Sequence, residues 1–199
     1  MPSRDEDQAE AMAAIGPMIP FLHKLLSDAT DFYFGPDYTD AARATHNPRA
    51  MKNCIYSRAE LLLMERFEEM PGASVSRSGG LVVLSYRGLV GVRTKNVSPS
   101  GRHRNAQTKQ QLDYDYQLPL PGFPNTFRLT AGYQLDPFNT SVERIMIARP
   151  VGKEVWWTSQ VLMHDEAATW EDITPPSFSN IDSIDFDAVR RARKNHGPR

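Results

Sequence analysis

The residues with the most evident chemistry are seven Lys and Arg side chains between positions 70 and 112, a segment that contains no Asp or Glu. They are Arg77, Arg87, Arg93, Lys95, Arg102, Arg104 and Lys109. Cationic side chains bind phosphates, and neighbouring Asn and Gln amides can pair with base edges. The segment therefore predicts a surface that binds nucleic acid, with an affinity that falls steeply as salt rises.

The flanking sequence has the opposite charge. Residues 1–69 sum to −5, from 7 basic and 12 acidic side chains, and residues 113–189 sum to −8, from 4 basic and 12 acidic ones. The net charge of −1 therefore conceals an uneven charge map, which bears on partners rather than on fold. Two alternatives to nucleic acid follow. The acidic flanks neutralise the segment within the chain or across a homodimer, or an acidic protein binds it.

Six of the cations are predicted nucleic-acid contacts. Arg93 and Lys95 are two residues apart on a strand expected over residues 89–97, so their side chains share one face of that strand. The others lie in the turn before this strand, in the loop after it and on a helix expected over residues 105–117. The predicted contacts are Arg87, Arg93, Lys95, Arg102, Arg104 and Lys109.

His103 offers a catalytic alternative. It stands between Arg102 and Arg104, and a metal-independent ribonuclease needs little more than a proton-transferring side chain and cations that hold the phosphate. Any basic loop with a histidine meets that requirement. We therefore expect a protein without catalysis, and His103 remains the candidate if catalysis occurs.

The sequence lacks the ligand patterns of a metal site. The expected order of a helix, a β-meander and a further helix is that of a restriction-endonuclease core. Such a core needs an acidic metal ligand two residues before a lysine on a strand. Here that position, two residues before Lys95, is occupied by Arg93. The five His residues are dispersed, and none lies at a zinc-ligand spacing from another or from Cys54. We expect no metal and no cofactor, and a core of this class would be catalytically dead. The single cysteine fits a reducing cytoplasm.

Helices are predicted in the N-terminal part, over residues 18–69. Apolar residues recur at helical spacing between Pro20 and Phe32, and a capping box of Ser57 and Glu60 predicts a second helix from 57 to 69. Residues 1–10 are expected to be frayed. Residues 35–50 are expected to form a loop that holds a short helix.

The periodicity changes to alternation after Pro71-Gly72, and residues 73–162 predict a sheet. Five strands stand out, over residues 81–86, 89–97, 126–134, 141–149 and 154–162, and the first meander is expected to run from residue 73 to 97. The chain is therefore predicted to be α+β, with N-terminal helices packed on a mostly antiparallel sheet of two three-strand meanders separated by a short helix.

Residues 1–162 are predicted to form a single domain, followed by a partly ordered tail over 163–199. Acids precede bases between 183 and 195, which favours a short helix there. Isolated apolar residues favour docking of the tail on its own domain over docking on a partner. No apolar run reaches membrane-spanning length and the N-terminus has no secretory core, so we expect a cytoplasmic protein.

Residues 81–162 carry a series of short motifs on the expected sheet. They are Val92-Arg93-Thr94-Lys95, Leu120-Pro121-Gly122-Phe123-Pro124, Gly132-Tyr133-Gln134-Leu135-Asp136, Ala148-Arg149-Pro150 and the strand with Trp157. This pattern resembles a small, poorly characterised family of bacterial mobile-element proteins encoded beside helix-turn-helix regulators and zinc-peptidase domains. The resemblance implies a toxin–antitoxin or phage-defence setting.

The combined prediction is a non-catalytic regulatory or accessory protein that binds nucleic acid through residues 77–109. The first alternative is a protein-interaction module that binds a co-encoded regulator or toxin. The second is the metal-independent ribonuclease.

Overall fold

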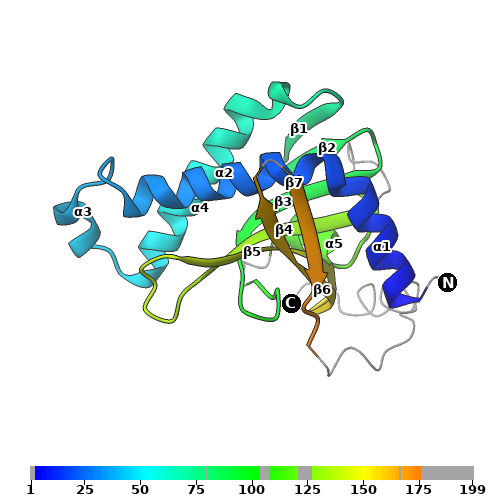
Figure 1. The fold of residues 1–199 in the computed structure, drawn as a ribbon. Helices are drawn as coiled ribbons and strands as arrows, with labels where there is room; N and C mark the ends of the chain where they lie inside the picture. Colours follow the sequence, from blue (N-terminus) through cyan, green and yellow to red (C-terminus); the bar gives the residue numbers. More distant parts are fainter. Residues whose placement is uncertain (1–2, 79, 104–107, 121–126, 166, 176–199) are drawn as a thin grey trace.

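The computed structural model describes residues 3–78, 80–103, 108–120, 127–165 and 167–175 (Figure 1). Helices come first along the chain and a mostly antiparallel sheet of seven strands follows, so the predicted α+β class is confirmed. The helices are α1 (Arg4–Ile15), α2 (Ile19–Phe34), α3 (Asp40–Ala44), α4 (Pro48–Arg66) and α5 (Lys109–Asp115), with short 3-10 turns at Gly16–Met18 and Phe67–Glu69. No helix in this part of the chain is long and apolar enough to cross a membrane.

The strands follow one another in the sheet in the order in which they occur in the sequence. They are β1 (Ala73–Ser78), β2 (Leu81–Tyr86), β3 (Val90–Asn96), β4 (Phe127–Leu135), β5 (Val142–Val151), β6 (Glu154–His164) and β7 (Ala167–Asp172). Neighbouring strands are antiparallel except for β3 and β4, which are parallel. A parallel pair needs a crossover connection, and the connection from β3 to β4 contains α5.

Both faces of the sheet are covered. Helices α1, α2 and α4 lie on one side of the sheet (Figure 1). Val82 and Leu84 of β2 belong to the main core that these helices form with the sheet. Leu81 and Val83 point to the opposite face and pack with Tyr114 of α5, whose hydroxyl donates to the carbonyls of β3 and β4. Helix α5 is therefore fixed against the β3–β4 pair, next to the basic residues of β3.

The N-terminal residues were expected to be frayed, and this prediction is wrong. Ser3 and Glu6 form a capping box that begins α1, and the helix packs on the sheet through polar side chains. Asp7 accepts from Trp157 Nε1 at 2.7 Å, and Gln8 donates to Ser159 Oγ at 2.9 Å. The polarity that suggested fraying reflects partners on β5 to β7 instead.

The second helix begins earlier than predicted. The Asn47 side chain accepts from the amides of Arg49 and Ala50, and Pro48 occupies the first helical position, so α4 starts there. Ser57 lies in the middle of α4, and the predicted capping box with Glu60 does not begin a helix. Helix α3 is the short helix expected in the preceding loop.

The first residues after 162 belong to strands of the sheet. Strand β6 extends to His164, and β7 pairs with it as the last strand of the sheet, so the first part of the expected tail lies on its own domain. The helix expected over 183–195 lies outside the described residues.

Candidate anion-binding site

A polar cluster forms where β2 and β3 separate. The two strands pair only over Leu84–Tyr86 and Val90–Val92, whereas β3 stays paired with β4 as far as Asn96. The second half of β3 therefore has a strand neighbour, β4, on one side only. On the side that β2 leaves, it meets side chains from α4, from α5 and from the loop after β3. We call this group the β3 polar cluster; its members are Tyr56, Glu60, Arg93, Lys95, His103, Gln111 and Asp115.

Arg93 lies at the bottom of the cluster and is 1% exposed. Its guanidinium donates to Gln111 Oε1 at 2.6 Å, forms an ion pair with Asp115, and stacks 4.5 Å from the centre of the Tyr114 ring. Asp115 and Gln111 come from α5, one turn apart, so the short crossover helix supplies the partners of the strand arginine. Arg93 therefore holds the fold together at this point, and its predicted surface contact with a phosphate does not fit its position.

His103 packs against the same guanidinium. Its Nε2 faces Arg93 Nη2 and lies 3.4 Å from Asp115. A guanidinium only donates, so Nε2 accepts and the ring proton is on Nδ1. Burial lowers the pKa of His103, the charges of Arg93 and Lys95 lower it further, and Asp115 acts in the opposite direction. The imidazole is therefore neutral near pH 7, with Nδ1–H as its remaining donor.

Lys95 is the cluster's half-buried cation. Its Nζ lies 4.5 Å from the centre of the Tyr56 ring, and it forms no ion pair with a carboxylate of the described residues. The nearest acid on α4, Glu60, accepts a hydrogen bond from the Tyr56 hydroxyl. Burial, followed by the charge of Arg93, lowers the pKa of Lys95 to about 8, although the charges of Glu60 and Asp115 oppose this. An ammonium in this position costs the fold free energy, because burial and the neighbouring guanidinium disfavour its charged form.

This cost leads to a prediction for Lys95→Met. The variant is expected to be more stable than the wild type near pH 7 by about 1 to 3 kcal/mol, since a pKa difference of one unit corresponds to about 1.4 kcal/mol. The pKa of Lys95 is about 8 in the folded state and near 10.5 in the unfolded state. Between these values the unfolded state binds more protons, so the stability contributed by this site rises with pH.

Urea unfolding of both proteins near pH 7 and near pH 10 measures the effect. The advantage of Lys95→Met should shrink at the higher pH, whereas the matched exposed variant Lys153→Met should match the wild type at both. A variant less stable than the wild type near pH 7 would show that the ammonium supports the fold.

The remaining predicted contacts do not gather on one face. Arg87 is exposed in the tight turn after β2, where its φ of 48° and the φ of 67° at Gly88 reverse the chain. Arg102 is exposed and forms an ion pair with Glu154 of β6. Lys109 is exposed at the first position of α5. Arg104 lies outside the described residues.

One cation outside the predicted contact set lies near the cluster. Arg77 is exposed on β1, and its charge, like that of Arg93, lowers the pKa of Tyr56, which burial and Glu60 otherwise raise. The next residue, Ser78, accepts from Gln110 of α5 at 3.0 Å, so the ends of β1 and α5 are adjacent. Arg77 and Lys109 therefore lie on neighbouring elements, next to residues whose side chains contact each other. Their separation of 32 residues hides this proximity in the sequence.

Two further sets of polar side chains lie outside the β3 polar cluster. Cys54 Sγ lies 3.9 Å from His46 Nδ1, and the hydroxyls of Tyr33 and Tyr38 contact the same imidazole at 3.2 and 3.4 Å. The sequence predicts no zinc-ligand spacing between His46 and Cys54, and their contact across eight positions depends on how the residues before α4 fold onto it. No group of three His, Cys, Asp or Glu side chains in the described chain is arranged to hold a metal.

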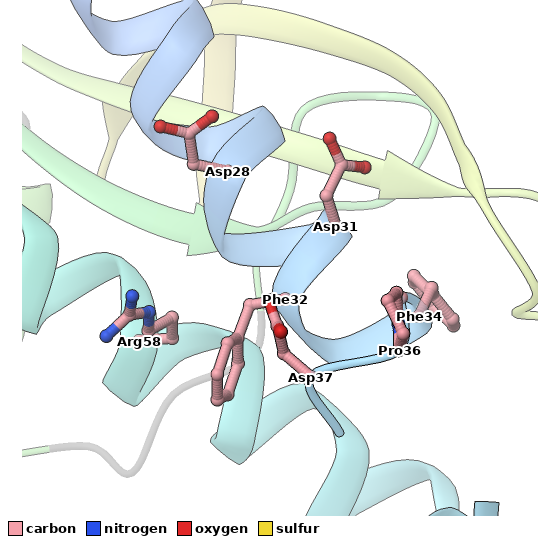
Figure 2. A pocket seen from close by; sticks show the side chains of 8 residues that line it. Asp28, Asp31, Phe32, Phe34, Pro36, Asp37 and Arg58 are labelled. Atoms are coloured by element: carbon pink, nitrogen blue, oxygen red, sulfur yellow. The ribbon is translucent and has the colours of Figure 1, made fainter. Parts of the chain in front are cut away.

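The second group lines a groove of about 580 Å³ between the end of α2 and α4 (Figure 2). Asp28 on its edge is already paired with Lys24 and Arg66, and Arg58 stacks 4.6 Å from the centre of the Phe32 ring. Asp28 and Arg58 are therefore already in contact with other side chains of the protein.

Comparison with protein-family models, with curated proteins and with solved structures finds no match. The β3 polar cluster and the cations near it are therefore the features of the described chain that bear on function.

Proposed function

We propose that the protein binds nucleic acid, with Lys95 as the central phosphate contact and Arg77 and Lys109 as outer contacts. The observation that carries the proposal is the state of Lys95, a half-buried ammonium on the same strand as Arg93 that has no ion-pair partner in the described chain. A phosphate would supply the missing negative charge, and charge-assisted hydrogen bonds to phosphate are among the stronger polar contacts.

The two outer cations support the same proposal. Arg77 and Lys109 are exposed and lie on the adjacent ends of β1 and α5. Together with Lys95 they provide three positive charges from three elements, which matches the spaced phosphates of a nucleic-acid backbone better than a single small anion. Arg93 takes a positioning role, because its donors are engaged with Asp115, Gln111 and His103.

The ribonuclease alternative has less support. A histidine that removes a proton from a hydroxyl needs a free accepting nitrogen, and the accepting Nε2 of His103 is engaged with Arg93. The regulatory setting implied by the mobile-element resemblance, with operator DNA or a co-encoded protein as partner, stays a prediction.

Fluorescence anisotropy with single-stranded RNA, single-stranded DNA and duplex DNA tests the proposal. Three phosphate contacts predict that affinity falls about 20- to 40-fold between about 50 and about 200 mM salt. Arg77→Glu/Lys109→Glu should abolish measurable binding, because two attractive contacts become repulsive.

The matched control is Arg49→Glu/Lys153→Glu, which changes the net charge equally at two exposed positions on other elements. It should keep most of the wild-type affinity. Equal losses in the two double variants would mean that overall charge, and not this site, drives binding. Absence of binding at the lower salt would instead favour the protein-interaction alternative.

A further inference from the structure

The starting point is a buried donor that lacks an acceptor. The side chain of His103 is 8% exposed, and its Nδ1 has no hydrogen-bond partner in the described part of the chain. Because Arg93 donates to Nε2, the proton is on Nδ1, on the ring edge away from Arg93 and Asp115. Buried donors without an acceptor are rare in proteins, since the lost hydrogen bond with water is not replaced. An acceptor from a ligand would satisfy this group.

Lys95 supplies a second donor in the same cluster. Lys95 lies two residues after Arg93 on β3, so alternation predicts that both side chains leave the strand on one face, and Arg93 itself contacts His103. Tyr56 covers the ammonium with its ring face and offers it no hydrogen-bond acceptor there, because the Tyr56 hydroxyl is directed to Glu60. Two donors from different segments, one neutral and one cationic, therefore have no protein acceptor within the described ranges.

The shape of the acceptor follows from burial. An internal phosphodiester carries a sugar on both sides, and it suits exposed cations such as Arg77 and Lys109. A terminal phosphate is attached through one ester bond, projects from the strand, and carries more negative charge with three free acceptor oxygens. Because it has a single ester attachment, such a group needs a narrower opening than an internal phosphodiester does to reach a side chain that is 8% exposed.

We propose that the β3 polar cluster binds the terminal phosphate of a nucleic-acid strand, with His103 Nδ1–H and Lys95 Nζ as its donors. The inference rests on the proposed function and specifies the part of the ligand that is recognised. Arg93 is a positioning residue because it donates to His103 Nε2 and so fixes the tautomer, and Asp115 is one because its ion pair holds Arg93 in place. Arg77 and Lys109 then hold the adjoining backbone and do not distinguish an end from the middle.

The test compares oligonucleotides of one sequence that carry a 5′-phosphate, a 3′-phosphate or hydroxyls at both ends. Anisotropy of an internal dye should show at least tenfold tighter binding of one phosphorylated form than of the hydroxyl form. Lys95→Met and His103→Phe should each remove most of this preference and retain the weaker binding of the hydroxyl form. Lys109→Ala should weaken all three forms by a similar factor and keep the preference.

Each result has a defined meaning. Binding of all three forms with equal affinity would overturn the end-recognition inference and leave the proposed function standing. Failure of every form to bind would overturn the proposed function as well. A preference that survives in both Lys95→Met and His103→Phe would place the terminal phosphate elsewhere.

A second measurement on the wild type covers the case in which His103→Phe does not fold. Nitrogen NMR of the imidazoles during titration with inorganic phosphate should shift the protonated Nδ1 of His103, while exposed His164 serves as the reference. An unchanged His103 signal at saturating phosphate would overturn the inference.

Discussion

Replacing Asp7 with alanine is expected to lower the free energy of unfolding by about 3 to 5 kcal/mol, the usual effect of removing one partner of a buried ion pair. Asp7 is 3% exposed, forms an ion pair with Arg149 and accepts from Trp157 Nε1 at 2.7 Å. Burial raises the pKa of Asp7, against the opposing effect of the Arg149 charge and the hydrogen bond from Trp157. The alanine variant would remove the acceptor of the Trp157 indole and the ion-pair partner of Arg149.

Arg149 cannot relieve this loss by turning to water. Its guanidinium is packed 4.8 Å from the centre of the Phe127 ring and 5.4 Å from that of Trp156, in a residue that is 8% exposed. Urea unfolding followed by tryptophan fluorescence measures the change. Glu10→Ala is the matched control, because Glu10 is an exposed acid on the same helix, and it should change stability by less than about 0.5 kcal/mol. A loss of under about 1 kcal/mol in Asp7→Ala would show that the pair contributes little.

Arg93→Met is expected to destabilise the protein by a similar amount, about 3 to 5 kcal/mol. The variant keeps an apolar stem over Tyr114 but leaves Asp115, 12% exposed, without its ion-pair partner. The Gln111 carbonyl and His103 Nε2 also lose their donor. The exposed arginine of the β2–β3 turn provides the control, and Arg87→Met should leave the unfolding midpoint nearly unchanged.

A double variant separates the two costs in Arg93→Met. If most of the loss comes from the uncompensated charge of Asp115, Arg93→Met/Asp115→Leu should recover a large part of it, because paired apolar replacement of a buried ion pair is often tolerated. A double variant that is less stable than either single variant would show that the hydrogen bonds to Gln111 and His103 dominate instead.

The α+β class and most of the sheet could be predicted from the sequence. Alternating apolar residues in strands such as 81–86, turn residues between them and the polar helix before the proline-rich stretch are local signals, and local signals determine local backbone conformation. The same holds for α2, whose apolar stripe has helical spacing. The start of α4 is also encoded locally, because Asn47 is a helix-capping residue and Pro48 suits the first helical position.

The candidate site depended on contacts that no local pattern encodes. Alternation predicts that Arg93 and Lys95 share one face of a strand, but only the parallel crossover shows that α5 supplies Asp115 and Gln111 to Arg93. It also shows that β2 diverges from β3, so that Tyr56 of α4 covers Lys95.

Sequence alone therefore determined the charge of this segment, the secondary structure that carries it and the absence of ligand patterns for a metal. Tertiary structure decided which of its cations are buried, which are paired and which remain for a ligand. The physical reason is that burial and pairing depend on residues distant in the chain: Asp7 meets Arg149 across 142 positions, and Arg93 meets Asp115 across 22. The same composition of charges makes an open surface or an internal network according to which helix covers the strand.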